Sequence, residues 1–129
     1  MSKQGGADME SSAFDEGMSI LDAMLGEGKN AYIEKLNSLY DGLGNSIAEQ
    51  VFGKLYGMPA LDLKTKQLIT VALMLENGDE EQLLFHAQGA LNLGVTKEQL
   101  VEAALQSITV IGIPRALRGL KIIRKLTDK

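Results

Sequence analysis

The sequence contains no cysteine and no tryptophan, and only two prolines among its 129 residues. The absence of cysteine excludes disulfides, thiolate metal sites and cysteine nucleophiles. With three Phe and three Tyr, the core is expected to be mostly aliphatic. No apolar run reaches the roughly 18 residues that span a bilayer, and the polar first ten residues lack the layout of a signal peptide. We therefore expect a cytoplasmic protein with no membrane partner.

Charge is unevenly distributed along the chain, although the net charge is only −4. Acidic residues are frequent in the first thirty positions, whereas all three arginines fall between Arg115 and Arg124. Three interpretations of the basic stretch are open. It forms a solvated helix face, it pairs with the acidic end of the chain, or part of it binds an anionic substrate. Net negative charge, and basic residues without interleaved aromatics, argue against a nucleic-acid partner.

Apolar residues recur at helical spacing throughout the chain, and no stretch alternates as a β-strand does. This pattern predicts an all-α fold of about seven short helices. We expect residues 1–10 to form a flexible tail and residues 11–129 to form a single domain. The expected helices cover residues 11–25, 30–40, 45–56, 62–77, 79–93 and 97–111, and a last helix starts near residue 113.

Several helix ends carry recognisable capping residues. Asp62 and Asp79 stand where N-caps are needed, and Thr96 with Gln99 forms a capping-box pattern. Gly94 occupies the position at which a helix commonly ends in a left-handed residue.

The later helices carry more apolar residues than one buried face requires. The helix 97–111 has them on more than one side, which fits either a buried core helix or a subunit interface. The helix 62–77 is apolar nearly all round and is expected to be central. In the last helix one stripe is expected to face the core: Ile113, Leu117, Leu120 and Ile123.

His86 is the chain's one histidine and lies on the expected helix 79–93, along one edge with Gln82 and Gly89. A single histidine without a neighbouring ligand pattern does not predict a metal site. It can serve as a general acid or base near neutral pH, or it can be a structural residue. Because no phosphate-binding glycine loop is present either, no metal and no cofactor are expected.

Three segments together resemble the carboxymuconolactone decarboxylase family, whose superfamily includes alkylhydroperoxidase D. They are residues 61–72, residues 84–100 and residues 111–117, and the resemblance extends from about residue 40 to residue 126. Its most specific part is the run that begins with His86 and continues as Gly-Ala-Leu-Asn-x-Gly-Val-Thr from Gly89. The resemblance implies the all-helical fold of that superfamily and a homo-oligomer, a trimer or a hexamer.

The redox branch of that superfamily uses a CxxC motif, a following histidine and an upstream glutamate. If His86 matches that histidine, Asp79 and Gln82 occupy the two thiol positions, and Gln67 follows Lys66 where an Arg-Glu pair is usual. The missing thiols and carboxylate disfavour thiol peroxidase activity.

The cysteine-free branch resembles 4-carboxymuconolactone decarboxylase, which implies cofactor-free decarboxylation or proton transfer on a small carboxylated lactone or related acid. The resemblance makes His86 the candidate proton donor or carbonyl polariser. Arg115, Gln67 and Gln82 are candidate substrate-binding residues, with Arg115 as the carboxylate anchor. The alternatives are an enzyme or small-acid binder with an unassigned substrate, and a non-catalytic oligomeric module on the same scaffold.

Overall fold

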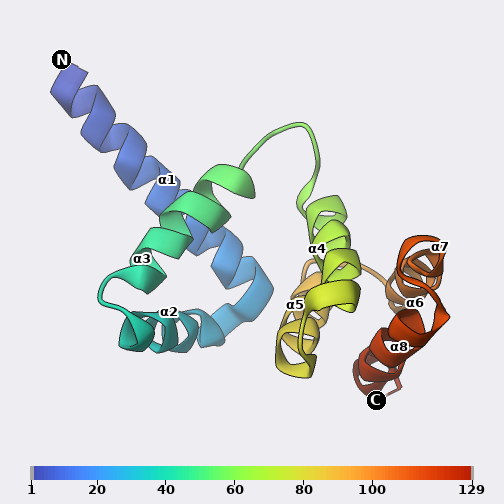
Figure 1. Ribbon diagram of the computed structural model, residues 1–129. Helices are drawn as coiled ribbons and strands as arrows, with labels where there is room; N and C mark the ends of the chain where they lie inside the picture. The colour runs from blue at the N-terminus through green and yellow to red at the C-terminus, as the bar shows by residue number, and fades with distance from the viewer. Residues whose placement is uncertain (1, 129) are drawn as a thin grey trace. The chain divides into compact units, whose positions relative to one another are not determined.

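The computed structural model describes the backbone of residues 2–128 and the side chains of residues 13–128. All regular structure in this part of the chain is helical, which confirms the predicted all-α class (Figure 1). Contacts divide the chain into two compact units, one ending at Ala60 and one beginning at Leu61. We had expected a single domain from residue 11 onward. None of the helices in the described residues is long and apolar enough to cross a membrane.

The first unit is built on the contact between its first helix and its last. Leu21 and Met24 of the first helix and Phe52 of the last are buried there. The first helix begins at Ser2, so helix covers most of the segment that we expected to be a tail. The elements are α1 (Ser2–Leu25), a 3₁₀ turn η1 (Gly26–Gly28), α2 (Lys29–Leu39), α3 (Leu43–Ile47) and η2 (Ala48–Leu55).

The element η2 is a π-helix, where the sequence predicted an ordinary α-helix over residues 45–56. Its wider turn is visible where the Tyr56 N–H donates to the Val51 carbonyl at 2.9 Å, five residues back. The ring of Phe52 lies 5.0 Å from that of Tyr56 and meets Tyr32 edge-on at 6.2 Å. Apolar residues spaced four apart fit either kind of turn, so the sequence pattern did not distinguish them.

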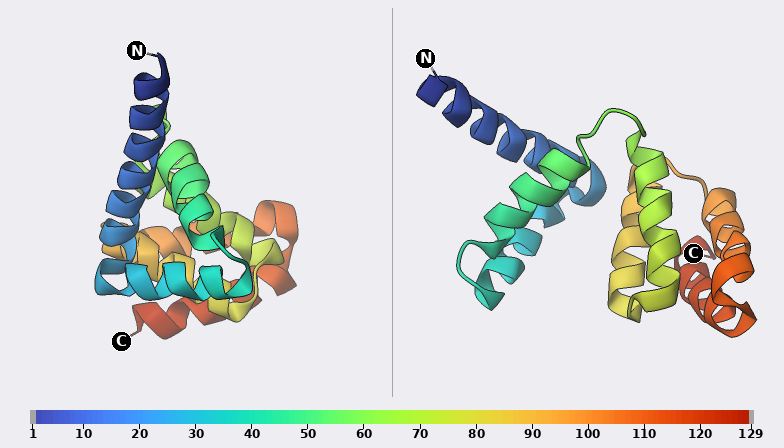
Figure 2. Two further views of the ribbon diagram at one scale, coloured as in Figure 1. Left: turned by 90° about the vertical axis from the view of Figure 1, so that its left-hand side faces the viewer. Right: turned by 45° about the horizontal axis from the view of Figure 1, so that its top comes forward.

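The second unit contains five helices, and α4 contacts α5, α6 and α8. The right-hand view of Figure 2 shows α4 and α5 side by side as a helical hairpin. The elements are α4 (Leu63–Asn77), α5 (Glu80–Asn92), α6 (Lys97–Gln106), α7 (Ile108–Ile111) and α8 (Ile113–Thr127). Their core is aliphatic, as expected, and includes Val71, Leu75, Leu83, Ala87, Ala90, Val95, Leu100, Ala104, Ile122 and Ile123.

The predicted caps of this unit are confirmed. Asp62 and Asp79 each accept a bond at 2.8 Å from the N–H three residues later. Thr96 and Gln99 form both bonds of a capping box. Gly94 ends α5 with φ of +99°, a conformation that side chains with a Cβ rarely adopt.

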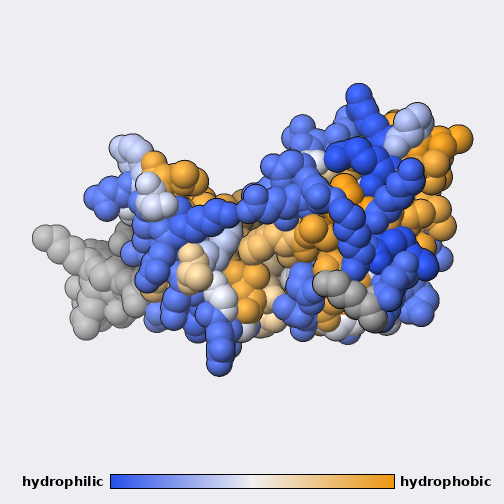
Figure 3. Space-filling model, turned by 90° about the horizontal axis from the view of Figure 1, so that it is seen from below, coloured by the Kyte–Doolittle hydropathy of each residue, from blue (hydrophilic) through white to orange (hydrophobic). Residues whose placement is uncertain are grey.

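The helix predicted over residues 97–111 is interrupted at Ser107. The Ala103 carbonyl accepts from both the Ser107 N–H, at 3.1 Å, and the Ser107 hydroxyl, at 2.9 Å, and such back-bonding by a serine often bends a helix. Leu100 and Ala104 are buried before the break, whereas Val110 after it is 86% exposed. Figure 3 shows hydrophobic residues reaching the surface next to hydrophilic ones.

The apolar stripe predicted for α8 is partly wrong. Ile113 is 58% exposed and Leu117 is 41% exposed, while Ala116 and Gly119 are buried beside Ile123. Small residues allow two helices to approach closely. A Cβ at Gly119 would overlap the Leu75 Cδ2 methyl group of α4, so α8 turns its small residues inward.

The basic side chains of α8 meet partners near the turn between α4 and α5. Arg115 lies 3.4 Å from the Glu76 carboxylate, and Lys125 pairs with Glu80. Arg118 donates to the Gly78 carbonyl at 3.0 Å. All of these side chains remain exposed, which fits the solvated-face interpretation of the basic stretch.

Candidate functional site

Two of the four predicted site residues are in direct contact. The Gln67 side-chain nitrogen Nε2 lies 2.8 Å from the backbone oxygen of His86 and 3.2 Å from its ring nitrogen Nδ1. Gln67 belongs to α4 and His86 to α5, so the contact joins the two helices of the hairpin. The sequence suggested both residues, through the resemblance, without indicating the contact itself.

The hairpin accounts for this pairing. Asn77 ends α4 and Asp79 caps α5, so the two helices run antiparallel and residues near the start of α4 face residues well into α5. Gln67 lies in one row with Val71 and Leu75, four and eight residues on, and all three are buried. The site therefore extends the packed seam between the helices.

Gln67 is fully buried, and a buried amide needs hydrogen-bond partners. A backbone carbonyl can only accept, so the group of Gln67 that faces the His86 oxygen must be its NH₂. The backbone oxygen and the ring nitrogen Nδ1 that this nitrogen meets both belong to His86. The amide orientation is therefore fixed by the backbone of α5.

The His86 imidazole is half-buried, and burial lowers its pKa because the charged form loses solvation. The Phe85 ring meets it edge-on at 5.0 Å. A neutral imidazole carries one donor and one acceptor nitrogen, so it can bind an oxygen or a proton at the nitrogen that remains free. Phe85 had no recognisable signal in the sequence as a neighbour of the site.

Gln82 lies one helical turn before His86 on α5, and its side chain is exposed. It borders a hollow of about 390 Å³ together with Thr70 and Met74 of α4. Thr70 lies three residues beyond Gln67 on α4, a little less than one helical turn. Gln82 thus lies one turn from His86 along α5 and borders a hollow that neither Gln67 nor His86 lines.

Arg115 is not part of this cluster. It pairs with Glu76, which lies nine residues beyond Gln67, or about 13 Å along an α-helix. Arg115 lines a second hollow with Leu73 and Asn77. Those two residues also line the hollow at Gln82, so the two hollows adjoin.

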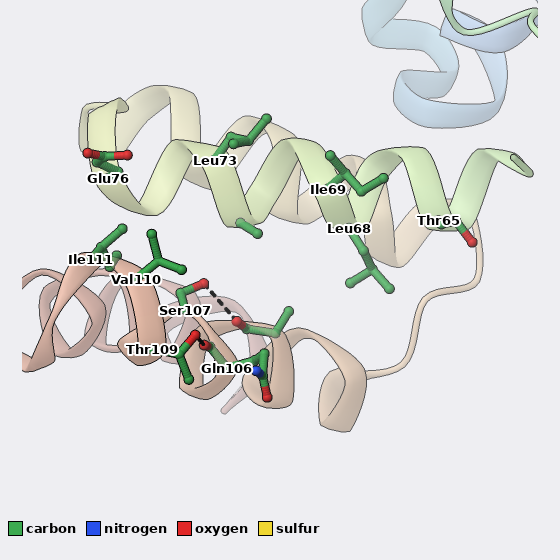
Figure 4. A pocket seen from close by; sticks show the side chains of 12 residues that line it. Thr65, Leu68, Ile69, Leu73, Glu76, Gln106, Ser107, Thr109, Val110 and Ile111 are labelled. Atoms are coloured by element: carbon green, nitrogen blue, oxygen red, sulfur yellow. Dashed lines mark hydrogen bonds between the residues drawn. The ribbon is translucent and has the colours of Figure 1, made fainter.

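A separate apolar groove of about 420 Å³ runs between α4 and the α6–α7 segment. Figure 4 shows Leu68, Ile69 and Leu73 of α4 and Val110 of α7 among its lining residues. At 100° per residue, the lining positions of α4 lie on the face opposite Gln67. The groove is therefore distinct from the His86–Gln67 pair.

Within the described residues, no three His, Asp or Glu side chains gather as metal ligands would. The pair consists of an imidazole and an amide, which offers hydrogen bonding and proton chemistry. The fold and this site define an all-helical protein whose central hairpin holds a lone histidine against a buried glutamine, in a chain without thiols.

Comparison with known proteins identifies the family. The model of the carboxymuconolactone decarboxylase family matches residues 45–125, and the chain belongs to this family. The matched span includes Gln67, Gln82, His86 and Arg115.

Individual relatives include proteins named as decarboxylases. The chain is 31% identical over 102 residues to the 4-carboxymuconolactone decarboxylase of Acinetobacter baylyi, covering 78% of this chain and 76% of that protein. It is 29% identical over 126 residues to a nitrosuccinic acid decarboxylase of Metarhizium robertsii, covering 90% and 85%. It is also 27% identical over 106 residues to an uncharacterised protein of Methanocaldococcus jannaschii, covering 81% and 97%.

Proposed function

We propose that the protein is a cofactor-free decarboxylase of a small carboxylated lactone or related acid, with His86 as its acid/base residue. The observation that carries this proposal is the placement of the one histidine. It is half-buried, held by Gln67 at one ring nitrogen, and located on the hairpin within the span that matches the family.

The names of the relatives support the type of reaction. Both substrates so named are small carboxylic acids, one with a lactone and one with a nitro group. Each of these groups can accept the electron pair that a departing CO₂ leaves behind. Such a substrate supplies its own electron sink, and the protein then needs only to bind the acid, stabilise charge on an oxygen and manage one proton.

The hollow beside Gln82 is a suitable place for such a substrate. Its volume, about 390 Å³, lies within the range of ligand pockets. Gln82 offers an amide to a substrate carboxylate, and Thr70 offers a hydroxyl. A substrate there would lie one turn along the seam from His86.

Arg115 is proposed as the carboxylate anchor at the far side of the adjoining hollow. Its present partner Glu76 is exposed, and exposed ion pairs contribute only about 0–1 kcal/mol. A substrate carboxylate can therefore replace Glu76 as the partner of Arg115 at little cost. We expect Arg115→Ala to raise KM for a carboxylated substrate. Arg124→Ala is the matched control, because Arg124 lies on the same helix but pairs with Asp128 at 2.8 Å.

The homo-oligomer implied by the resemblance is also proposed. It is supported by exposed apolar side chains in the second unit, among them Leu73, Val110 and Ile113. Light scattering after size-exclusion chromatography tests this, and a monomer at micromolar concentration would contradict it.

Activity is tested by incubating the purified protein with a mixture of carboxylated lactones and nitro-substituted dicarboxylic acids, followed by mass spectrometry. Depletion of one compound with formation of a product lighter by CO₂ is the expected result. His86→Asn should abolish it without changing the helical circular dichroism. If no compound is consumed, the protein is a binder or a non-catalytic member, and calorimetry with the same acids distinguishes these two.

A further inference from the structure

We propose that Gln67 is a positioning residue that holds His86 in one tautomer, with the lone pair on Nδ1 and the proton on Nε2. His86 then faces its substrate as a neutral hydrogen-bond donor. This inference narrows the role of His86 in the proposed function from acid/base residue to hydrogen-bond donor, and it rests on that function only for its catalytic meaning.

The first step of the argument is the direction of the two hydrogen bonds. The Gln67 NH₂ must donate to the His86 backbone oxygen at 2.8 Å, since that oxygen has no proton to give. The same nitrogen lies 3.2 Å from Nδ1 and has a second proton available. A protonated Nδ1 would place two donors against each other. The favourable arrangement therefore leaves Nδ1 as the acceptor.

The second step concerns the amide's freedom to turn over. In many surface glutamines the oxygen and nitrogen can exchange places. Here exchange would direct the Gln67 oxygen at the His86 carbonyl oxygen, two acceptors at hydrogen-bonding distance. Because Gln67 is fully buried, no water is available to relieve that contact. Hence the His86 carbonyl of α5 determines the orientation of the Gln67 amide, and that orientation determines the tautomer of the His86 ring.

The third step is the chemical consequence. A neutral imidazole with its proton on Nε2 can donate a hydrogen bond to an oxygen that becomes negative as the bond to CO₂ breaks. Nδ1 has no carboxylate to which it could pass a proton, because its partner is an amide. Losing the Nε2 proton would leave an imidazolate anion, so His86 polarises the oxygen without giving up its proton.

The proton balance follows. The carbon–carbon bond breaks, its electron pair moves to the lactone or nitro oxygen of the substrate, and CO₂ leaves. The carbanion equivalent then takes a proton from water and leaves hydroxide. In this sequence His86 stabilises charge, and water is the proton source.

The tautomer can be measured without any substrate. The chain has one histidine, so nitrogen-15 labelling of histidine gives two ring signals with no assignment ambiguity. At a pH above the imidazole pKa, we expect a protonated Nε2 and an unprotonated Nδ1. Observation of a protonated Nδ1, or of two tautomers in comparable amounts, would overturn the proposal.

Variants of Gln67 test the cause. In Gln67→Glu one carboxylate oxygen can accept from Nδ1–H, although the other then faces the His86 carbonyl oxygen without a proton between them. The ring should change to the opposite tautomer, and any kcat should fall by about 100-fold. Gln67→Met keeps the side chain long and uncharged but removes the donor, and some Nδ1-protonated ring should appear. Gln88→Glu is the matched control. It makes the same change on the exposed side of α5, where Gln88 contacts Asn92, and should leave tautomer and kcat as they are.

These readouts separate this inference from the proposed function. The predicted tautomer in a protein that consumes no acid would leave the inference standing and remove the function. Decarboxylation by a protein whose ring is protonated on Nδ1 would remove the inference alone. If Gln67→Glu does not fold, the nitrogen-15 spectra of the wild-type protein and of Gln67→Met still show whether Gln67 determines the tautomer of His86.

Discussion

The close approach of α8 to α4 leads to a prediction that can be worked out in numbers. Replacing Gly119 with Ala places a methyl group against the buried Leu75 side chain. The new Cβ would overlap the Leu75 Cδ2 methyl, whereas Cγ at 3.2 Å and Cβ at 3.5 Å are tight or ordinary neighbours. Only one methyl group therefore has to move, but it has no exposed surface into which to move.

Overpacking of this kind costs about 1–3 kcal/mol, while Ala in place of Gly inside a helix gains about 1 kcal/mol. We therefore expect Gly119→Ala to lower the free energy of unfolding by about 1 kcal/mol. The sign should reverse in a Leu75→Ala background, since the opposing methyl is then absent. There the helix-propensity gain remains, and the coupling between the two sites is about 1–3 kcal/mol.

The assay is urea unfolding followed by far-UV circular dichroism, combined with native-state hydrogen exchange. Exchange is needed because the chain has two compact units, and the amides of α4 and α8 report on the second alone. Gly28→Ala is a control in the first unit, where a Cβ meets only the Leu25 Cβ at 3.9 Å, and it should leave the exchange of the α4 and α8 amides unchanged. Equal effects of Gly119→Ala with and without Leu75 would refute the steric explanation.

Two further predictions concern His86 and the cap of its helix. Burial lowers the His86 pKa, so the unfolded chain binds a proton before the folded chain does as the pH falls below about 6.5. The free energy of unfolding should therefore decline between that pH and the folded-state pKa of His86. Urea unfolding across this pH range checks the decline, and His86→Asn should remove the part of it that His86 causes. Asp79→Ala should lower the free energy of unfolding by about 1 kcal/mol and speed amide exchange in the first turn of α5. Asp79→Asn should restore most of that loss, because asparagine is also a good N-cap. Equal exchange rates in the two variants would contradict the capping role of Asp79.

Much of the fold could be predicted because the deciding residues are close together in the sequence. Asp62, Asp79 and the Thr96–Gln99 box mark helix starts by contacts that span three residues. The buried face of α8 could not be predicted this way. The buried face of α8 depends on the contact of Gly119 with Leu75, forty-four residues earlier in the chain. A prediction from apolar spacing assigns large residues to the buried face, whereas here small residues permit the close packing.

The sequence singled out the residues of the candidate site but not their arrangement. His86 and Gln67 were identified through the resemblance, and the helical hairpin brings them together. The bond from Gln67 to a backbone oxygen has no signature in the sequence, because every residue has such an oxygen. Arg115 was chosen from its place at the start of a basic helix, and its contact with Glu76 depends on how α8 lies against α4.

The backbone oxygen and the Nδ1 that Gln67 contacts both belong to His86, and this has a consequence for binding. An amide is planar, so its two N–H bonds diverge at a fixed angle and restrict both the backbone position and the ring torsions of His86. The conformational entropy lost by that side chain is incurred when the protein folds. A ligand that binds at Nε2 meets a ring that is already ordered, so its affinity is not reduced by the cost of ordering it.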